Sequence, residues 1–381
     1  MGIGGGYVSL LDDDAGRRIY RRGLELGVNY LDGRYGNSNA MLRPLIRGRR
    51  EQLVLGTKTA EQTAEGALSR IEEDLRELGT DTLDIFYLRT YTQEMLAGHF
   101  APGGSVEGVL KAKEQGKVRA LGLAGHSDLT ALAKGIETGL VDVCMLPLNI
   151  VRREALEQVI PAAQRHDVGI TVMKPMSVGM APARLALPWL ATQPIHTLAP
   201  GVSTVEQLEL DAAVLDRSPM TLTPQEEEEV EGWRQRLDTA ACRICDRVCQ
   251  PVCEAKIPID VYLYHDTFYN QYRALGLDGF MAVPAAPWVR AAAEEHFARA
   301  VQSIRACTHC GKCDPVCPHG LPIESMLEKT AAGYETLLEA VREAGWKTQY
   351  GGAASPYAKS VGDSKSPSQA EKRPQALNSG R

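Results

Sequence analysis

The sequence contains no apolar run of the roughly 18–20 residues that a membrane span needs. It also has no stripe of Lys and Arg residues that would attract nucleic acid. Residues 1–6 lack the charged and apolar regions of a secretory signal peptide, and position six is not the Ser or Thr that N-myristoylation requires. We therefore expect a cytoplasmic protein that neither spans a membrane nor binds nucleic acid.

The composition is that of a soluble globular protein. The chain has 381 residues, of which 44% are hydrophobic and 24% are charged, and its formal net charge is −6. This length is sufficient for one large domain with a smaller domain appended to it.

Cysteine residues are concentrated toward the C-terminal end. Eight of the nine form two groups: Cys242, Cys245, Cys249 and Cys253, and Cys307, Cys310, Cys313 and Cys317. The second group has the spacing C-x2-C-x2-C-x3-C-P, by which bacterial ferredoxins hold [4Fe–4S] clusters. There, three cysteines of one loop bind one cluster, and the fourth usually binds the other cluster of a two-cluster protein. We therefore predict iron–sulfur clusters ligated by these eight cysteines.

Other uses of cysteine fit this pattern less well. Zinc sites typically pair C-x2-C units across longer loops, and disulfide bonds are rare in the cytosol. The first group is less regular, C-x2-C-x3-C-x3-C, so one cluster remains an alternative to the two that we favour. His309 and His319 flank the second group and would tune a cluster by hydrogen bonding. Cys144, the ninth cysteine, is expected to be a small, buried core residue within a strand.

Residues 2–236 alternate short apolar runs with segments in which apolar residues recur at the helical period. Eight runs are expected to be strands: residues 2–8, 27–32, 53–58, 84–90, 118–125, 141–149, 169–176 and 196–202. Helices are expected between them, for example over residues 63–78, 105–117 and 153–166. Eight strand–helix pairs are typical of an α/β fold of the (β/α)8 TIM-barrel type. An open, doubly wound sheet is the alternative, because strand order is not visible in the sequence.

Active sites of such barrels lie at the C-terminal ends of the strands. Seven residues are candidates on this ground: Asp32, Lys58, Arg89, His126, Asn149, Lys174 and Gly201. Beyond the barrel (residues 1–220), we expect residues 221–347 to form a mainly α-helical, ferredoxin-like domain that carries both cysteine groups. Residues 348–381 are rich in Gly, Ser, Pro and Lys, and they are expected to be disordered or loosely packed.

Several segments of the barrel resemble signatures of the aldo-keto reductase family. The segment GVNYLDGRYGNSN resembles G-x-N-x-x-D-T-A-x-x-Y-G-x-S-E, and LVLGTKT resembles the strand that supplies the family's catalytic lysine. Three further segments also resemble motifs of the family: RIEEDLRELGTDTLDIFYLR, GKVRALGLAGH and PGVSTVEQL. The last of them resembles the family's phosphate-binding turn. The resemblance covers residues 2–215, and the whole chain resembles the iron–sulfur branch of the family.

The resemblance implies hydride transfer to a carbonyl group, in which a tyrosine protonates the developing alkoxide. On this basis Tyr35 would be the acid, Lys58 the cation that lowers the pKa of the tyrosine, and Asp32 the carboxylate that pairs with the lysine. The candidate cofactor-binding residues are Lys174, Gly201, Ser203 and Thr204.

The sequence departs from the family pattern at several positions. Asp32 and Tyr35 are three residues apart rather than the usual five. Arg89 stands where the family has a histidine, and because arginine stays cationic it would either favour an anionic substrate or pair with a structural carboxylate. His126 would then replace the lost proton donor or be an ordinary loop histidine. The positions that hold nicotinamide in the family carry Ala124, Gly125, Met145 and Met173. These replacements, and Glu206 in the phosphate turn, disfavour NAD(P)H as a cofactor.

Two functions are compatible with these residues. In the first, an iron–sulfur oxidoreductase acts on a small substrate in the barrel pocket, with electrons relayed through two [4Fe–4S] clusters. In the second, the barrel has lost carbonyl chemistry, and the chain is an electron-transfer or structural subunit of a redox complex. Either function implies a redox partner protein, such as a ferredoxin or a larger oxidoreductase complex. Tyr35, Lys58 and Asp32 favour the first function. The second is favoured by Arg89, Ala124, Gly125 and Met145.

Overall fold

The computed structural model describes residues 1–33, 36–245 and 247–344. Within these residues the strands form one parallel sheet, and each strand is hydrogen-bonded to the next one along the chain. The strands are β1 (Gly2–Gly4), β2 (Tyr30–Asp32), β3 (Val54–Thr59), β4 (Leu83–Arg89), β5 (Val118–Ala124), β6 (Val143–Pro147), β7 (Gly169–Met173) and β8 (Thr197–Ala199).

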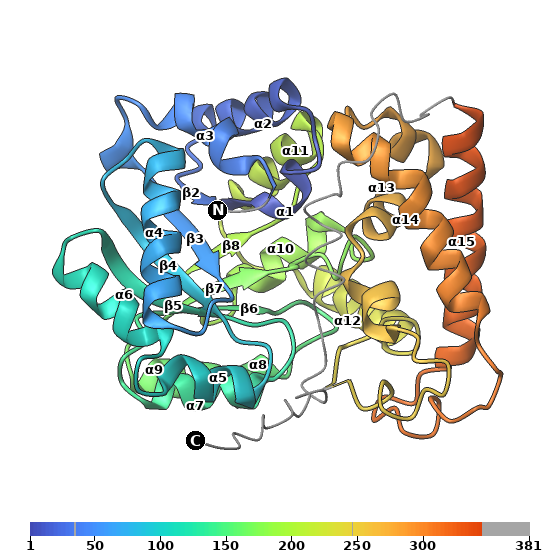
Figure 1. The fold of residues 1–381 in the computed structure, drawn as a ribbon. Coiled ribbons are helices and arrows are strands. Elements are labelled where there is room, and N and C mark those ends of the chain that lie inside the picture. Colours follow the sequence, from blue (N-terminus) through green and yellow to red (C-terminus); the bar gives the residue numbers. More distant parts are fainter. Residues whose placement is uncertain (34–35, 246, 345–381) are drawn as a thin grey trace, which may run out of the picture.

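The sheet closes on itself between β1 and β8. The N–H of Gly4 donates a 2.8 Å hydrogen bond to the carbonyl oxygen of Pro200, and Gly4 also pairs with Gly201. This closure and the sequential strand order confirm the predicted (β/α)8 barrel. They rule out the open doubly wound alternative, in which the strand order reverses. Figure 1 shows the helices of this part of the chain around the strands.

Helices connect successive strands on the outside of the barrel. They are α1 (Gly5–Val8), α2 (Asp13–Glu25), α3 (Ser38–Ile46), α4 (Ala64–Leu78), α5 (Gln93–Phe100), α6 (Ser105–Glu114), α7 (Leu129–Glu137), α8 (Ala155–Gln158), α9 (Ile160–Arg165), α10 (Ala183–Ala191) and α11 (Val205–Leu215), with a 3-10 turn η1 (Arg50–Gln52). Helix α4 shows how the sequence determines where a helix begins and ends. The Thr63 hydroxyl accepts a hydrogen bond from the Gly66 N–H at its start, and Gly79, with φ +70°, ends it. The helix expected over residues 63–78 is thereby confirmed.

Several expected elements are shorter than the sequence suggested, and two of them also contain a change of structure. The strand expected over residues 2–8 ends at Gly4, and α1 follows it directly. The helix expected over residues 153–166 is divided into α8 and α9, because Pro161 near the start of α9 has no N–H to continue the hydrogen-bond ladder. Each of the other expected strands overlaps the observed one.

Two tyrosines fill the inside of the barrel. Tyr30 and Tyr87 are 3% and 0% exposed, and their hydroxyl oxygens lie 3.2 Å apart. Glycine leaves room for both rings, since a Cβ atom on Gly122 would lie 2.3 Å from the ring of Tyr87 and one on Gly2 would lie 2.3 Å from that of Tyr30. The interior is therefore packed, and a functional site has to lie at the ends of the strands.

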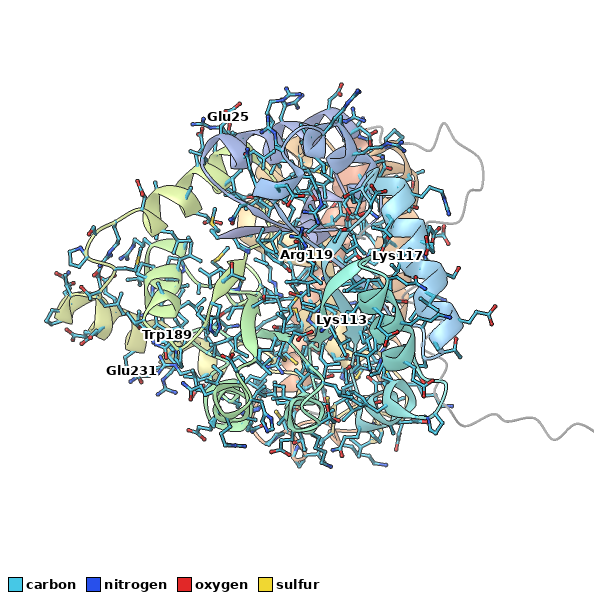
Figure 2. The ribbon with its side chains drawn as sticks, turned by 90° about the vertical axis from the view of Figure 1, so that its left-hand side faces the viewer. Glu25, Lys113, Lys117, Arg119, Trp189 and Glu231 are labelled. Carbon is cyan, nitrogen blue, oxygen red and sulfur yellow. The ribbon has the colours of Figure 1, made fainter. Side chains whose placement is uncertain are left out.

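Ion pairs join the N-terminal ends of the strands. Arg119, at the start of β5, is 2.8 Å from Asp84, at the start of β4, and Arg50 is 2.8 Å from the same carboxylate. Figure 2 shows Arg119 together with Lys113 and Lys117 on this side of the barrel. Charged residues at this end contribute to stability, whereas the C-terminal ends carry the candidate site.

The remaining helices lie beside the barrel, as Figure 1 shows. They are α12 (Pro224–Asp238), the π-helical turn η2 (Val261–His265), α13 (Thr267–Ala282), α14 (Pro287–Arg305) and α15 (Ile323–Glu343). Helix α12 packs against α10, and its Val230 and Leu237 belong to the core of the barrel. The other helices enclose a second core around Phe297 and Tyr334, which are both fully buried.

The loop after β1 joins both cores. Leu11 pairs with Ala285 in an antiparallel bridge, and the N–H of Asp12 donates a 2.8 Å hydrogen bond to the carbonyl oxygen of Pro284. Leu10 packs in the second core, whereas Leu11 packs in the core of the barrel. Three consecutive residues therefore connect the first strand to the C-terminal helices.

The domain boundary at residue 220 and a ferredoxin-like fold for residues 221–347 stay predictions. The expected loose tail, residues 348–381, lies outside the described residues. Among the helices that the structure describes, none combines the length and the apolar character that crossing a membrane requires.

Candidate functional site

Asp32 and Lys58 form a buried ion pair at the C-terminal ends of β2 and β3. The Nζ atom of Lys58 is 2.7 and 2.9 Å from the two carboxylate oxygens of Asp32, and the two side chains are 3% and 5% exposed. Burial raises the pKa of Asp32 above its ordinary value, and the charges of Lys58 and Arg89 and the N–H of Gly5 oppose this shift. The structure thus brings together two of the predicted catalytic residues.

Arg89, the third predicted catalytic residue, ends β4. Its side chain is partly buried, and its charge acts on the carboxyl group of Asp32. The backbone beside it is fixed, because its carbonyl oxygen lies 2.9 Å from Nε2 of buried His99. A second cation therefore stands near the ion pair. Tyr35, the predicted acid, lies outside the described residues.

Tyr87 is a neighbour of the ion pair that sequence reasoning missed. The Nζ atom of Lys58 is 5.7 Å from the centre of its ring, and its hydroxyl lies 3.4 Å from that of Thr171. Burial raises the pKa of Tyr87 to about 12, so that its hydroxyl holds its proton firmly. In the sequence, a tyrosine at an inward-facing position of a strand indicates only a core residue. The buried and protonated side chain of Tyr87 is consistent with that role.

His126 follows β5 and is enclosed by rings and charges. Its ring centre is 5.9 Å from that of Tyr91 and 5.2 Å from that of His265. Burial, followed by the charges of His265, Lys174 and Lys58, lowers the pKa of His126 far below its ordinary value. The imidazole is therefore neutral near pH 7, and in this form one ring nitrogen still donates a hydrogen bond.

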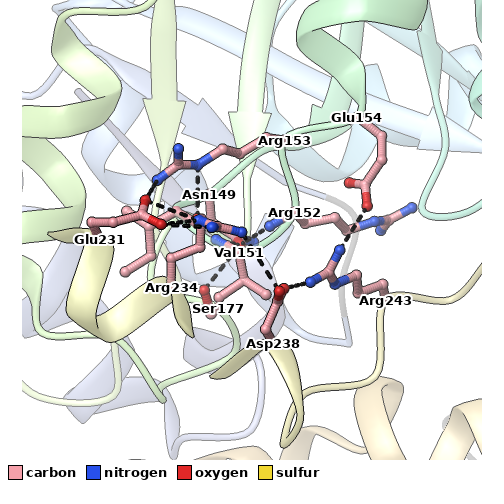
Figure 3. A network of polar contacts seen from close by, with 11 residues as sticks. Asn149, Val151, Arg152, Arg153, Glu154, Ser177, Glu231, Arg234, Asp238 and Arg243 are labelled. Carbon is pink, nitrogen blue, oxygen red and sulfur yellow. Dashed lines mark hydrogen bonds and ion pairs between the residues drawn. The ribbon is translucent and has the colours of Figure 1, made fainter. Parts of the chain in front are cut away.

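Asn149 fixes the loops that follow β6 and β7, as Figure 3 shows. Its amide donates a 3.1 Å hydrogen bond to the carbonyl oxygen of Lys174. Its Oδ1 accepts hydrogen bonds from the N–H of Arg152 and the hydroxyl of Ser177, both at 2.9 Å. This one side chain, only 1% exposed, therefore sets the backbone positions of Lys174 and Arg152.

Lys174 and Arg152 meet side chains of the C-terminal helices. The Nζ atom of Lys174 is 5.1 Å from the ring centre of Tyr264, and the guanidinium carbon of Arg152 is 5.9 Å from the same point. Burial, followed by repulsion from Arg273 and Arg152, lowers the pKa of Lys174 to about 8. Sequence reasoning missed Tyr264, His265 and Arg273, because no pattern in the chain shows that η2 and α13 lie over the barrel mouth.

The predicted cofactor turn after β8 is covered by other parts of the chain. The ring of Tyr7 lies against Gly201, where a Cβ atom would be 2.5 Å from it. The hydroxyl of Ser203 accepts a 2.9 Å hydrogen bond from the side-chain amide of Gln271 on α13. Helix α13 therefore reaches the place where the resemblance implies a cofactor.

Gln207 forms hydrogen bonds with two further polar groups of this turn. The N–H of Ser203 donates a 2.8 Å hydrogen bond to Oε1 of Gln207, and the hydroxyl of Thr204 accepts a 3.2 Å hydrogen bond from the Gln207 N–H. Glu206 adds a negative charge in the first turn of α11. The N–H and hydroxyl of Ser203 and the hydroxyl of Thr204 are thus bonded within the chain.

The two cysteine groups meet in the helical part of the molecule. One cavity is lined by Cys307, Cys310 and Cys313 of the second group and by Cys253 of the first. Its wall also includes apolar side chains, among them that of Leu327, and the polar residues Glu254, Thr308 and Glu324. All nine cysteines of the chain lie in the described residues, and none of them forms a disulfide bond.

The other three cysteines of the first group adjoin the barrel. Cys242, Cys245 and Cys249 lie close enough together for their charges to interact. Cys242 also packs with Val178 and Tyr264, so this group lies next to the loop after β7.

Comparison with known proteins identifies the barrel. Residues 1–184 match the model of the Aldo/keto reductase family. This match and the relatives named below support similarity of the barrel to the aldo-keto reductase family. The chain is 27% identical over 254 residues to an aldo-keto reductase from Mycobacterium avium (strain 104), a match that covers 61% of this chain and 85% of that protein. An aldo-keto reductase from Mycolicibacterium paratuberculosis matches with the same identity and coverage. These homologues support an oxidoreductase of the aldo-keto reductase superfamily.

Solved aldo-keto reductase structures show the same fold. The holo form of an aldo-keto reductase from Bacillus halodurans superposes with a TM-score of 0.52 at 21% identity, covering 61% of this chain and 91% of that one. An aldo-keto reductase from Klebsiella pneumoniae in complex with NADPH superposes with a TM-score of 0.51 at 21% identity, covering 61% and 89%. The family match ends at residue 184, so both cysteine groups lie beyond it.

Proposed function

We propose that the chain is a cytoplasmic iron–sulfur oxidoreductase whose aldo-keto reductase barrel acts on a small substrate, with electrons relayed through two [4Fe–4S] clusters. The cavity lined by Cys253, Cys307, Cys310 and Cys313 carries this proposal. Three cysteines from one loop and one from a distant group are the ligand set of a two-cluster ferredoxin. The absence of disulfide bonds leaves all four of these thiols available as ligands.

In a two-cluster ferredoxin, the fourth cysteine of each group binds the cluster of the other group. By this exchange, a cluster held by the first group would take Cys317 as its fourth ligand. His319, two residues further along, lies within electrostatic range of Arg152, which also acts on Cys242. This neighbourhood supports a second set of four cysteines beside the barrel.

The position of the first group suggests how the two parts of the molecule work together. Cys242 packs with Tyr264, and Tyr264 in turn contacts Lys174 at the barrel mouth. A [4Fe–4S] cluster held there would supply one-electron transfer beside the barrel pocket. The pocket retains the Asp32–Lys58 pair, and Arg89 favours an anionic substrate. A redox partner protein, a ferredoxin or a larger complex, would exchange electrons with the clusters.

A second function is favoured by other contacts in the barrel. Tyr7 and Gln271 cover the phosphate turn, and Met145 places its sulfur 3.7 Å from Nζ of Lys58. These contacts support an electron-transfer or structural subunit whose barrel no longer performs carbonyl chemistry. Titration of the anaerobically purified protein with NADH, NADPH and flavins, followed by absorbance, supports the first function if one of them binds, because an electron-transfer or structural subunit needs none of them in its barrel.

The iron–sulfur proposal is tested by metal analysis. Anaerobically prepared protein is expected to contain about eight iron and eight sulfide per chain, as two cubane clusters require. Cys253→Ser and Cys310→Ser are expected to damage the same cluster, and therefore to leave the same electron paramagnetic resonance signal, whereas Cys317→Ser removes the other signal. Cys144→Ala is the matched control and should retain all of the iron, since Cys144 is buried within β6.

Three results would contradict parts of this proposal. Zinc in place of iron would reject the clusters, and about four iron per chain would reject the two-cluster arrangement. If Cys253→Ser removed the same signal as Cys245→Ser, the exchange of fourth ligands would be wrong.

A further inference from the structure

Three cations with no carboxylate partner meet at the barrel mouth. Arg152 is 5% exposed, whereas Lys174 and Arg273 are partly buried and retain some accessible surface. Across the described residues, none of the three lies within ion-pair distance of an Asp or Glu oxygen, although many other Arg residues do. Arg152 instead donates a hydrogen bond to the backbone carbonyl oxygen of His126. Arg273 contacts the side-chain amide oxygen of Asn270 and the sulfur of Met180.

The three cations are close neighbours. Lys174 and Arg152 contact one ring, that of Tyr264, at 5.1 and 5.9 Å. Arg273 reaches the same loop from α13, since its guanidinium group is 3.7 Å from the sulfur of Met180. Its charge is the strongest electrostatic influence on Lys174. Like charges brought together and partly withdrawn from water repel one another, so this arrangement needs a compensating anion.

The nearby carboxylates are already engaged by other residues. Asp260 lies 3.0 Å from Nε of Arg247. Asp266 lies 2.5 Å from Nε2 of His296, and its other oxygen accepts a hydrogen bond from the N–H of Tyr269. Glu154, the third carboxylate of this region, is 3.5 Å from Arg243. Asp266 attracts Lys174 and Arg273 from a distance, but among the described residues none of these carboxylates forms an ion pair with any of the three cations.

The cysteine groups compensate only part of this charge. Arg152 lies within electrostatic range of Cys242, so thiolates of the first group would balance it. The charges that act on Lys174 and Arg273 come from other Arg, Tyr and Asp residues, and no cysteine is among them. Lys174 and Arg273 therefore call for a different anion.

The loop that presents Lys174 is held in an unfavourable conformation. Lys174, Ser177 and Val178 have φ values of +57°, +50° and +55°, a region that a β-branched residue such as Val178 rarely enters. Asn149 stabilises this conformation by its hydrogen bonds to Lys174 and Ser177. Strain of this kind persists where the surrounding structure enforces it, and such positions cluster at ligand sites.

We propose that Lys174 and Arg273, assisted by Arg152, bind the carboxylate or phosphate group of a small anionic ligand between the barrel mouth and α13. The guanidinium group of Arg273 suits a two-oxygen acceptor, and the ammonium group of Lys174 adds a point charge. His126 lies within electrostatic range of both Lys174 and Lys58, so a ligand held there extends toward the Asp32–Lys58 pair. That the ligand is a substrate rests on the proposed function, whereas its binding does not.

Calorimetric titration of the full-length, anaerobically purified protein tests the proposal. The probes are malonate and inorganic phosphate, each at constant ionic strength set with sodium chloride. We expect submillimolar binding of at least one, and the stronger of the two identifies the ligand chemistry. Lys174→Met and Arg273→Met are each expected to weaken binding about tenfold or more, because each removes a charge-assisted hydrogen bond. Lys134→Met is the matched control and should bind as the unaltered protein does, since Lys134 is bonded only to Gln93 at the surface.

Thermal unfolding of the unliganded variants separates a ligand site from structural cations. Removal of an uncompensated cation should leave the melting temperature unchanged or raise it. In the calorimetric titration, Arg273→Lys should retain part of the affinity for the anion. The proposal is wrong if neither probe binds more tightly than chloride, if both Met variants bind normally, or if both are strongly destabilised without ligand. Iron is measured on the same samples, so loss of the clusters is distinguished from loss of the anion site.

Discussion

The side-chain amide of Gln271 donates a 2.9 Å hydrogen bond to the hydroxyl of Ser203, and both residues are 3% exposed. Ser203 lies in the turn that the aldo-keto reductase resemblance associates with a cofactor phosphate. Gln271 comes from α13, beyond the residues that match the family. The C-terminal helices therefore contribute directly to the end of the barrel where its chemistry would take place.

The first prediction concerns nicotinamide cofactors. We expect NADPH to bind weakly and no more tightly than NADH, because Gln271 and Gln207 occupy the polar groups of the phosphate turn and Glu206 would repel the additional phosphate. Isothermal titration calorimetry under anaerobic conditions measures both affinities. A low-micromolar dissociation constant for NADPH would overturn this expectation.

The second prediction concerns the buried ion pair. Lys58→Met should lower the free energy of unfolding by about 3–5 kcal/mol, because it leaves the carboxylate of Asp32 buried without its cation. Urea denaturation at pH 7 measures the loss. The double variant Lys58→Met/Asp32→Leu should recover much of it, since both charges are then gone. Equal losses in the single and double variants would show that the pair is not the cause.

The third prediction concerns Asp211, which is 3% exposed and has a carboxylate oxygen without a hydrogen-bond partner among the described residues. Burial raises its pKa to about 7 in the folded protein, against about 3.9 in an unfolded chain. Between these values the folded state binds more protons than the unfolded state, so this residue makes stability fall as pH rises from about 4 to 7.

Denaturation of Asp211→Asn at several pH values tests this sign. The variant should be more stable than the original protein at pH 8, by roughly 2–4 kcal/mol, and equally stable near pH 4. Asp216→Asn, at an exposed position after the same helix, serves as the control and should follow the original pH dependence. A variant less stable at pH 8 would contradict the prediction.

The fourth prediction concerns packing inside the barrel. Gly122→Ala should destabilise the protein by about 3 kcal/mol, because the new Cβ atom would lie 2.3 Å from the ring of Tyr87. Combining it with Tyr87→Leu should restore part of the loss. Gly169→Ala is the matched control at the start of β7, where the nearest atom would be 3.7 Å away. Thermal unfolding compares the three variants, and similar losses for Gly122→Ala and Gly169→Ala would refute the argument.

Most of the barrel could be predicted from the sequence because its signals are local. The alternation of apolar runs and helical periods gave the strand–helix count. The family resemblance implied that Asp32 pairs with Lys58. The strand predicted over residues 2–8 was too long, since an apolar and glycine-rich run does not show where extended backbone turns into the first turn of a helix.

The contribution of the C-terminal helices to the site could not be predicted. Tyr264, Gln271 and Arg273 lie in a segment whose own pattern indicates helix but not its partner surface. Their contacts join residues far apart in the chain, and such contacts depend on how two folded surfaces pack. The clusters predicted from cysteine spacing likewise stay a prediction that metal analysis will test.

The bridge between Leu11 and Ala285 has a consequence for how the protein is made. The ribosome releases Leu10 and Leu11 before strands β2 to β8, but their partners in the C-terminal helices emerge only after all of these strands. The apolar side chains of Leu10 and Leu11 therefore remain without their final contacts while the later barrel strands are translated, and chaperones have a defined segment to protect. A prematurely terminated chain would leave the same segment exposed and so be marked for degradation.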